Sequence, residues 1–508
     1  MSARVEPSVS FYRGVYAVGT LALVTACALG ISWALRSGLW AAAALPLAVL
    51  ALLLLAVRRR AAELHAYAHI PGPRPSFFVG NLPALMDRGH GGRDQALAAL
   101  HAEYGPVVRI HLAWGHDAYV SLAYASANLH RKDLDSQRRA DRTLLPTSLM
   151  GMPRGEQHRA HRLAMAPFFT VNAVKAGGHV LREVSGDYVD RWRANGGVGK
   201  GALQQDIHRW SAHCMSSYMF GAAWDTTTDL QRYFAALAEI EEQISFRAFH
   251  PFFVRWIFPL RSLAARAAYL YLYGFLGQVF ARRAAPGCPH RRGGPADLLG
   301  EFVKLHANAG SPWSRRECVE EMMSLVLGGT DAMSYAIDQT LILLSRSPEV
   351  QAEARRRVAA ARSAGEAAHE VPYVKHILYE SFRLYPPVPF SAKVAHEGLV
   401  EEGLAVPPGA TIMWAKNVVG RNAAIFPEPE RFDPERFEQG HETAAAMLPF
   451  GAGPRHCIGN RLAEAQCVAL LTEILENFNI EAIEGLDVTF RATVSISLSV
   501  LPVRLTPL

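Results

Sequence analysis

The sequence predicts a mainly helical protein with a smaller β region, preceded by an N-terminal transmembrane helical hairpin. Two long apolar runs near the start of the chain predict the hairpin. The apolar spacing from Cys318 to Ser345 predicts one helix long enough to cross a whole domain. Runs of strand-forming residues at 107–120, around a glycine turn, and at 492–500 predict small sheets beside the helices.

The two apolar runs cover residues 15–35 and 39–57, and neither contains a charged residue. Each is long enough to cross the hydrocarbon core of a bilayer. Only residues 36–38 separate them, so we expect a tight hairpin with both outer ends on one side. Arginines precede the first run and follow the second, which predicts that the N-terminus and the rest of the chain face the cytoplasm. Two alternatives are a signal peptide with a lipoprotein-like cleavage box at 24–27, and one span plus an interfacial segment.

The rest of the chain predicts one large domain. Half of the 508 residues are hydrophobic, which allows one or more large cores. Glycine and proline are scattered, and no repeat or long low-complexity spacer divides the chain. We therefore expect a membrane anchor at residues 1–60, a connector with a proline-rich hinge at 61–75, and one domain at 76–508.

The cysteine content and the net charge indicate in which compartment the protein resides and which partners it binds. The six cysteines are widely spaced and form no CxxC pair, which argues against a disulfide framework and for a reducing compartment. The net charge of +6 fits a protein that lies against an anionic membrane or takes electrons from an acidic partner. Nucleic acid is not an expected partner, because the basic residues form no long interleaved tract.

The segment 450–459, FGAGPRHCIG, carries the strongest chemical signal in the chain. It combines an aromatic residue, two glycines, an arginine and a cysteine, namely Phe450, Gly453, Gly459, Arg455 and Cys457. An apolar helical run follows from Arg461, and a cysteine just ahead of a helix is placed where the macrodipole and a nearby arginine favour a thiolate. The glycines let the backbone approach a flat, bulky group. The alternative is that Cys457 is a buried small hydrophobic residue.

This loop resembles the haem-ligand loop of the cytochrome P450 family, in which the cysteine thiolate is the proximal ligand of the iron. The resemblance extends from Ile70 to the C-terminus. It implies a cytochrome P450 fold, one haem-thiolate catalytic domain and a haem b whose iron is bound by Cys457. It also implies a monooxygenase that uses O2 and a separate electron donor, either an NADPH-linked flavoprotein reductase or a ferredoxin. The bilayer anchor and an aromatic segment at 246–260 favour a lipophilic small-molecule substrate.

Four cations are expected near the haem propionates. A helical stretch opening at residue 155 places His158 and Arg162 on one face, where both reach one anionic group. The resemblance assigns this role to them, to Arg455 and to Lys393, which lies in a predicted strand at 388–393. The family often has an arginine at this position. Lysine supplies a point charge there but cannot make the bidentate hydrogen bonds of arginine. For the first two residues, an exposed basic helix face is the alternative. The preceding loop, 143–153, falls where the family often contacts substrate.

The long predicted helix has two adjacent glycines, 328 and 329, followed by Asp331 and Ala332. It resembles the helix that passes over the distal face of the haem, where an acid is followed by a threonine. Asp331 fills the acidic position, but Ala332 replaces the threonine whose hydroxyl helps to deliver protons for O–O cleavage. Thr330 and Ser334 lie about 160° away around the helix from position 332, so neither replaces that hydroxyl. An ordered water held by Asp331, a substrate hydroxyl, or chemistry that needs no dioxygen activation remain as explanations.

Two other functions stay open on the sequence alone. The missing threonine favours a peroxide-driven peroxygenase, or a hydroperoxide or endoperoxide isomerase, that needs no reductase. A membrane-tethered haem sensor or carrier is the non-enzymatic alternative.

A predicted helix at 374–384 carries Glu380 and Arg383 three residues apart on one face, and it stops before two prolines. A buried pair of this kind needs further hydrogen bonds. Arg436 matches the third member of this set in the family. The resemblance implies that Glu380, Arg383 and Arg436 form a structural lock behind the haem pocket.

Overall fold

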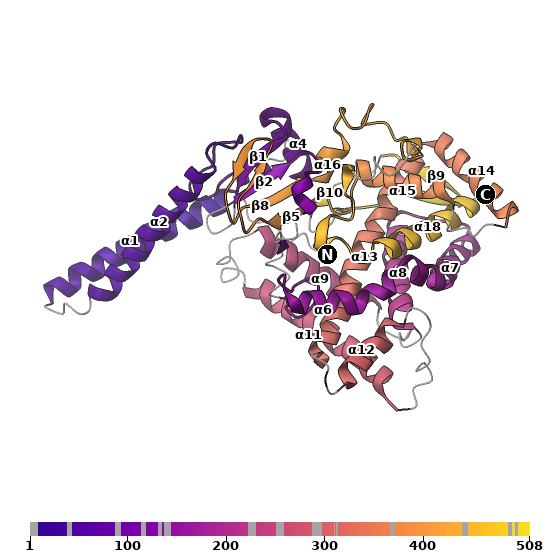
Figure 1. Ribbon diagram of the computed structural model, residues 1–508, viewed down its shortest axis with the longest axis horizontal. Coiled ribbons are helices and arrows are strands. Elements are labelled where there is room, and N and C mark those ends of the chain that lie inside the picture. Colours follow the sequence, from indigo (N-terminus) through magenta and orange to yellow (C-terminus); the bar gives the residue numbers. More distant parts are fainter. Residues whose placement is uncertain are drawn as a thin grey trace.

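The structure is a computed structural model in which helices outnumber strands; strands of the largest sheet lie beside an N-terminal helical hairpin, whereas another small sheet lies near the C-terminus (Figure 1). It describes residues 9–37, 43–86, 93–112, 118–130, 135–136, 144–221, 230–249, 259–286, 297–308, 310, 313–365, 371–438, 446–485, 490–492 and 496–508. The mainly helical fold with a smaller β region agrees with the sequence prediction.

The described helices are α1 (Val9–Arg36), α2 (Ala44–Ala66), α3 (Leu82–Met86), α4 (Arg93–Tyr104), α6 (Glu156–Met165), α7 (Val171–Ala194), α8 (Lys200–Phe220), α9 (Leu230–Phe249), α11 (Pro259–Ala284), α12 (Leu298–Ala307), α13 (Arg315–Ser345), α14 (Pro348–Ser363), α15 (Pro372–Leu384), α16 (Lys416–Gly420) and α18 (Asn460–Asn477). The described strands are β1 (Val107–His111), β2 (Ala118–Leu122), β3 (Asp135–Ser136), β4 (Val198–Gly199), β5 (Phe390–Val394), β6 (Leu399–Glu401), β7 (Leu404–Val406), β8 (Thr411–Ala415), β9 (Phe478–Ala482), β10 (Phe490–Ala492), β11 (Ile496–Leu498) and β12 (Val503–Pro507).

The largest described sheet has the strand order β1-β2-β8-β5-β3. β1 and β2 are antiparallel, with Val107 opposite Leu122, and they form the two strands predicted from residues 107–120. The turn between them lies outside the described residues. β2 pairs with β8 in parallel, and every residue of these two strands is buried. The sheet is therefore covered on both faces at its centre.

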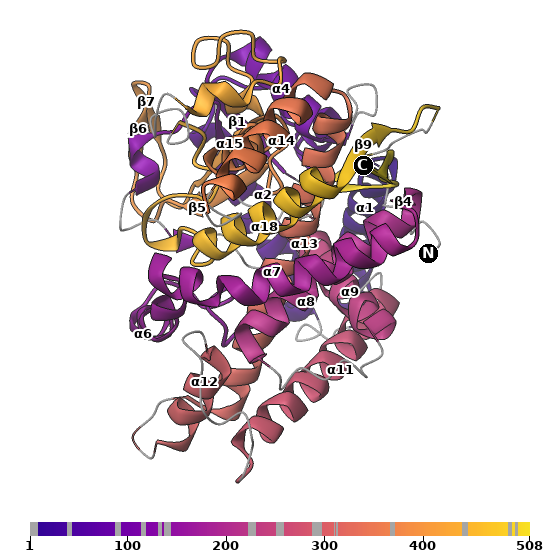
Figure 2. The same cartoon turned by 90° about the vertical axis from the view of Figure 1, so that its right-hand side faces the viewer.

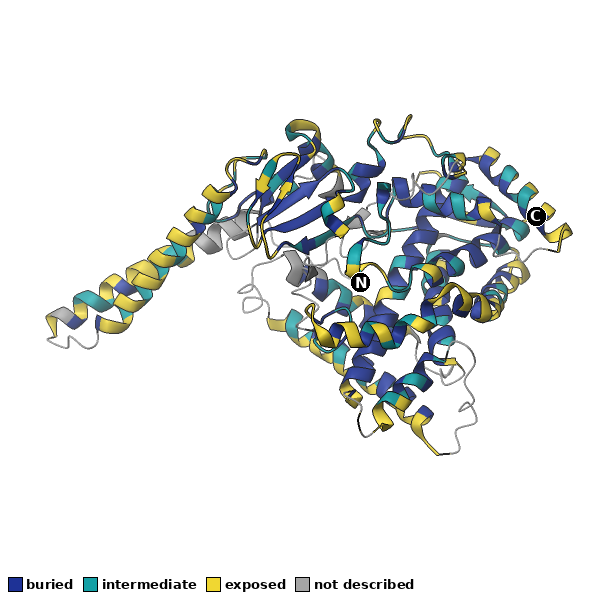
Figure 3. Ribbon diagram, viewed as in Figure 1, coloured by how far each residue is buried: buried dark blue, intermediate teal, exposed yellow. Residues whose placement is uncertain are grey.

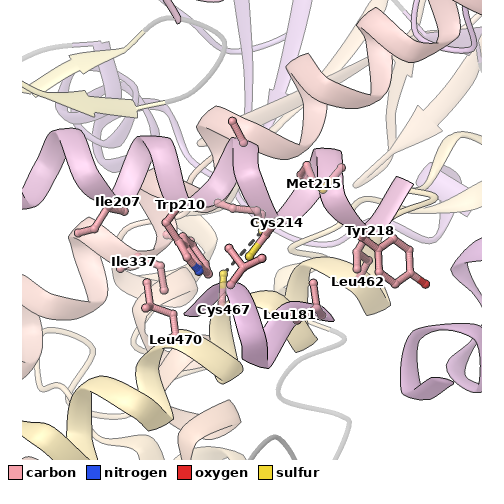
Figure 4. Packing of buried hydrophobic residues seen from close by; sticks show 14 of the residues in the cluster. Leu181, Ile207, Trp210, Cys214, Met215, Tyr218, Ile337, Leu462, Cys467 and Leu470 are labelled. Carbon is pink, nitrogen blue, oxygen red and sulfur yellow. Dashed lines mark hydrogen bonds between the residues drawn. The ribbon is translucent and has the colours of Figure 1, made fainter. Parts of the chain in front are cut away.

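Helix α13 is the central helix of the core, and almost all of it is buried. It begins three residues before the predicted start, because the Ser314 side chain accepts from Glu317 N–H and the Glu317 carboxylate accepts from Ser314 N–H. α8, α11, α15 and α18 pack against it, and Figure 4 shows Trp210 and Cys214 of α8 close to Cys467 of α18.

The predicted hairpin is present as α1 and α2, which lie side by side and project from the rest of the molecule (Figures 1 and 3). Many of its large apolar side chains are exposed, with Leu21 at 68% and Leu45 at 74%. Within the part of the chain that the structure describes, however, no helix combines the length and apolarity needed to cross a membrane. The predicted pair of membrane-crossing spans is therefore not supported.

The boundary between hairpin and domain also differs from the prediction, because residues 61–66 continue α2 instead of forming a connector. Arg60 attaches α2 to the domain through hydrogen bonds. Its buried guanidinium donates to the carbonyl oxygens of Leu112 (3.0 Å) and Phe77 (3.3 Å) and pairs with Glu63 (3.0 Å). These bonds attach the last turns of α2 to the end of β1.

The proline-rich hinge lies along β1. The N–H of Arg109 donates to the carbonyl oxygen of Pro71 at 2.8 Å, and its guanidinium donates to the carbonyl oxygens of Tyr67 and Ala68. A Cβ at Gly72, whose φ is +153°, would stand 2.5 Å from the Arg109 carbonyl oxygen. Glycine is therefore required where the hinge crosses the strand.

Two other predicted segments are only partly described. In the aromatic segment 246–260, Phe246 is buried and the Arg261 guanidinium lies 4.6 Å from its ring centre, so this ring packs inward. Residues 250–258 of that segment lie outside the described residues. β10 and β11 form the predicted late hairpin, whose turn at 493–495 also lies outside them.

Candidate functional site

The loop before α18 presents Cys457 at the surface. The N–H of Cys457 donates to the carbonyl oxygen of Phe450 at 2.9 Å, which closes the loop, and α18 begins three residues later. Cys457 is exposed, whereas the other cysteines in the described residues, 27, 214, 318 and 467, are buried. Burial raises the pKa of Cys214 well above its usual range and that of Cys318 to about 12, so both remain neutral thiols. Among the described cysteines, Cys457 is thus the one available as a ligand.

The loop is shaped by close contacts around Gly453 and Phe450. Gly453 has a φ of +66°, and a Cβ there would stand 3.1 Å from the Leu129 carbonyl oxygen and 3.3 Å from Lys393 Nζ. The ring of Phe450 packs edge-on against Phe382, with 5.8 Å between the ring centres. Gly459 differs, because a Cβ there would make only ordinary contact with the ring of Phe169 at 3.8 Å. The protein's own atoms therefore require glycine at 453 but not at 459.

Lys393, on β5, is a buried cation beside this loop. Its ammonium group donates to the carbonyl oxygens of Leu129 (2.6 Å) and Ala452 (2.5 Å), which are neutral acceptors. Burial, with a further contribution from the charge of Arg455, lowers the pKa of Lys393 to about 8. A nearby anion would offset both effects.

Two arginines approach the loop from different directions. Arg455 donates to the carbonyl oxygens of Leu149 (3.2 Å) and Met152 (2.6 Å), which belong to the loop predicted to contact substrate. Arg162, on α6, donates to the carbonyl oxygen of His456 at 3.0 Å. Burial lowers the pKa of Arg162, and the charge of the Cys457 thiolate opposes that change. The structure therefore brings Arg162, Arg455 and Lys393 to the cysteine loop.

His158 is buried four residues before Arg162 on the same helix. The sequence analysis assigned no role to the next histidine, His161. Its Nδ1 lies 2.7 Å from Glu321 of α13, and its ring stacks on Trp313 at 3.7 Å. These contacts attach α6 to α13, and thereby position Arg162.

Helix α13 contributes an open strip in the middle of an otherwise buried helix. Gly328 is exposed, Gly329 and Ala332 are half-buried, and their neighbours on both sides are buried. Because 328 and 332 are four residues apart, they lie on one face of the helix. A Cβ at Gly328 would meet only the Met150 methyl group, at 3.7 Å. Ala332, Phe450 and Ile458 all pack against the same hydrophobic core, so the strip and the cysteine loop both border it.

The hydroxyl groups beside Ala332 are directed elsewhere. Thr330 is buried, and its Oγ1 makes no hydrogen bond to the described residues. Ser334 is also buried and donates to the carbonyl oxygen of Asp331 at 2.9 Å. Neither hydroxyl lies on the strip, as the helix geometry predicts.

Asp331 is buried, and His208 Nδ1 of α8 lies 3.9 Å from its Oδ1. Burial, with the charge of Asp331, raises the pKa of Glu241 on α9 well above its usual range. The sequence analysis missed His208, because it comes close to Asp331 only where α8 packs against α13.

Glu380 and Arg383 form a fully buried ion pair on α15. Arg383 Nε and Nη2 donate to the two carboxylate oxygens of Glu380 at 2.7 and 2.8 Å. The remaining donors of Arg383 reach the carbonyl oxygens of Gly420, Pro429 and Arg431.

Arg436 completes this set. Its Nε lies 3.4 Å from Glu380, and Asp433 N–H donates to the same carboxylate at 2.8 Å. The three residues therefore join α15 to the segment that leads to the cysteine loop. The hydrogen bonds that a buried pair of this kind needs are present.

The residues present fit a flat cofactor that carries a metal and anionic groups. An accessible cysteine offers a thiolate, three cations near it donate to neutral acceptors, and α13 offers a strip without large side chains. The fold and the site thus define a mainly helical protein with a cysteine-bearing loop and an open helix face at one core. The sequence profile of the family Cytochrome P450 matches residues 70–505, and the chain belongs to that family, whose members bind haem. The predicted family resemblance is confirmed.

Relatives of known name agree with this assignment. The chain is 34% identical over 176 residues to cytochrome P450 11B1, mitochondrial, of Rattus norvegicus, covering 33% of this chain and 35% of that protein. It is 30% identical over 212 residues to probable cytochrome P450 4aa1 of Drosophila melanogaster, covering 39% and 41%. Putative cytochrome P450 135B1 of Mycobacterium bovis is 25% identical over 415 residues, covering 80% and 84%. The alignments thus span about a third of the rat protein and 41% of the fly protein.

Proposed function

We propose that this protein is a haem-thiolate monooxygenase that inserts one oxygen atom of O2 into a lipophilic small molecule. The observation that carries the proposal is the exposed Cys457 beside three cations, together with the open strip of α13 that borders the same hydrophobic core. When bound, haem b would supply the oxygen-activating chemistry that the side chains themselves lack.

The chain's own residues would hold the cofactor from two sides. Cys457 would bind the iron, and Arg162, Lys393 and Arg455, with His158, would neutralise the propionates. Phe450, Gly453 and Gly459 would shape the loop, while Glu380, Arg383 and Arg436 would keep its supporting segment in place. Asp331 would hold a proton beside Ala332.

Electrons would come from a separate donor, either an NADPH-linked flavoprotein reductase or a ferredoxin. Purified protein loaded with haem is titrated with lipophilic compounds, and substrates are found by the shift of the Soret band. Product formation with a surrogate reductase and NADPH then supports the proposal. Binding without any product, with every donor tried, would contradict it and favour a haem carrier.

A second function is favoured by Ala332 and by the direction of its neighbouring hydroxyls. Thr330 and Ser334 are buried, so no hydroxyl from these residues reaches the strip. A peroxygenase, or an isomerase of hydroperoxides or endoperoxides, would not need that hydroxyl. Turnover with peroxide alone that exceeds turnover with NADPH and reductase would select this function.

We also propose that the α1–α2 hairpin attaches the protein to a lipid bilayer. Its exposed leucines, including Leu47, Leu52 and Leu55, would be stable in an apolar surrounding and not in water. The arginines that flank the two apolar runs favour a domain on the cytoplasmic side. Replacing these three leucines by glutamine is expected to move the protein from the membrane to the soluble fraction. A distribution unchanged by the replacement would contradict attachment through the hairpin.

A further inference from the structure

Glu321 is a fully buried acid near the start of α13, and it holds two other segments of the chain. Its Oε1 accepts hydrogen bonds from His161 Nδ1 of α6 at 2.7 Å and from the N–H of Leu149 at 2.6 Å. Leu149 belongs to the loop at 143–153. The other carboxylate oxygen, Oε2, makes no hydrogen bond to the described residues. A single carboxylate oxygen therefore joins α13 to α6 and to this loop.

Each of the two attached segments leads to a cation of the candidate site. His161 is followed directly by Arg162, and Figure 2 shows α6 beside the start of α18, where Arg162 reaches the cysteine loop. The carbonyl oxygen of Leu149 accepts from Arg455 at 3.2 Å, while the N–H of the same residue donates to Glu321. Both arginines are thus directly connected to a residue that Glu321 holds.

The surroundings of His161 leave Glu321 as its hydrogen-bond acceptor. The buried ring stacks on Trp313, with 3.7 Å between the ring centres and 16° between the planes. Its Nε2 lies 3.7 Å from Glu317, which is too far for a hydrogen bond. A carboxylate only accepts hydrogen bonds, so His161 donates from Nδ1 to Glu321. Burial raises the pKa of Glu321, and the hydrogen bond from His161 opposes that rise.

Glu321 lies on the same face of α13 as the open strip. It precedes Gly328 by seven residues and Ala332 by eleven, which correspond to about two and three turns of an α-helix. The loop at 143–153 follows this face, because Leu149 is bonded to Glu321 and the Met150 methyl group lies 3.7 Å from a Cβ at Gly328. Glu321 therefore fixes the loop at one end of the strip.

We propose that Glu321 is a positioning residue for two cations of the candidate haem site, Arg162 and Arg455. His161 transmits the position of Glu321 to Arg162 along α6, and the backbone of Leu149 transmits it to Arg455. The inference rests on the proposed function, in which these arginines neutralise the haem propionates. Residues that orient a ligand from behind typically change its affinity by about 10- to 100-fold.

The first test is a double-mutant cycle on haem affinity, measured by haem transfer from the loaded protein to an acceptor protein. His161→Phe keeps a ring that stacks on Trp313 but removes the Nδ1 donor, and it is expected to weaken haem binding about 10-fold. Arg162→Met removes the cation itself. Because His161 acts through Arg162, the double variant is expected to bind haem no more weakly than Arg162→Met alone. Losses that multiply in the double variant would show that His161 acts independently of Arg162 and would overturn the proposal.

Two replacements test Glu321 itself. Glu321→Gln keeps a carbonyl oxygen that accepts both hydrogen bonds, so its haem affinity is expected to stay within about 3-fold of the wild type. Glu321→Leu removes the acceptor and is expected to weaken haem binding about 10²-fold, because both arginines lose their support. Asp338→Asn changes another fully buried acid of α13 and should leave the affinity unchanged. A glutamine variant as weak as the leucine variant would overturn the proposal. If Glu321→Leu fails to fold, the cycle with His161→Phe decides.

Hydrogen exchange gives a readout that does not depend on haem chemistry. The N–H of Leu149 is bonded to Glu321, so in the haem-loaded protein it is expected to exchange about 10-fold faster in Glu321→Leu than in the wild type. In His161→Phe and Asp338→Asn this amide keeps its acceptor and should exchange at the wild-type rate. Equal exchange in Glu321→Leu and the wild type would overturn the contact on which the proposal depends.

These results separate the inference from the proposed function. A wild type without the thiolate band in its carbon monoxide spectrum would contradict the proposed function and leave the hydrogen-exchange result valid. A wild type with the thiolate band, whose haem affinity changes neither in His161→Phe nor in Glu321→Leu, would overturn the role of Glu321 and leave the proposed function intact.

Discussion

The cysteine side and the α13 side of the site differ in how completely the protein satisfies its own polar groups. Around Glu380 and Arg383, both carboxylate oxygens and every donor of the Arg383 guanidinium have partners within the chain. In the middle of α13, by contrast, the helix opens at Gly328 and Ala332, and the buried hydroxyl group of Thr330 makes no hydrogen bond to the described residues. We propose that the first region holds the cofactor rigidly and that the second region influences which chemistry the cofactor performs.

The largest effect on stability is expected at the structural lock formed by Glu380, Arg383 and Arg436. Arg383→Met would leave the Glu380 carboxylate buried without its cation, which costs about 3–5 kcal/mol of stability. Thermal unfolding of the haem-loaded protein measures this loss. Arg356→Met is the matched control, because Arg356 pairs with Glu353 at the same spacing of three residues on an exposed face. Equal Tm changes in the two variants would contradict the lock.

A smaller, pH-dependent effect is expected at Lys393. Its folded pKa of about 8 lies below its ordinary value, and a bound propionate would favour the charged form. Above about pH 8, haem binding would therefore take up a proton, and the affinity would fall by up to about 10-fold per pH unit.

Two variants at this position sharpen the test. Lys393→Arg keeps its charge and should bind haem independently of pH between 8 and 10, a range taken from the lysine pKa values. Lys393→Met should bind haem about 10-fold more weakly at pH 7, because it loses one hydrogen bond from a charged donor. Haem transfer to an acceptor protein measures each affinity. A wild type whose affinity does not change above pH 8 would exclude a contact between Lys393 and a propionate.

The smallest effect is expected at Ala332. Position 332 is half-buried on the open strip, so a hydroxyl there has room. Ala332→Thr is expected to raise product per NADPH by a factor of about 2 to 10, because its hydroxyl group supplies a proton donor that position 332 lacks. Ala332→Val adds the same bulk without the hydroxyl and should give no gain. If the wild type is already tightly coupled and the threonine variant gains nothing, proton delivery is not impaired.

The cysteine side could be predicted from the sequence because its residues lie in short local patterns. Phe450, Gly453, Arg455 and Cys457 lie within eight positions of one another, and Glu380 and Arg383 lie one helical turn apart. Helix α13 followed from apolar spacing, and the β1–β2 pair from strand-forming residues around a glycine turn. The spacing between residues that are close in the sequence can be determined from a single sequence.

Contacts between distant segments could not be predicted in this way. His208 lies close to Asp331 only because α8 packs against α13. Arg60 reads as a flanking charge of the apolar run, yet it is buried against the end of β1 and extends α2 through residues expected to form a connector. In both cases tertiary packing, which leaves no local pattern, decides the outcome.

The most direct test of the account is the difference spectrum of the reduced, haem-loaded protein with and without carbon monoxide. We expect the Soret band of a thiolate-ligated haem in the wild type and of an imidazole-ligated haem in Cys457→His. Cys467→Ser, which changes a buried cysteine of α18, is expected to keep the wild-type spectrum. A wild-type spectrum without the thiolate band, or a thiolate band that survives in Cys457→His, would contradict the assignment of Cys457 as the iron ligand.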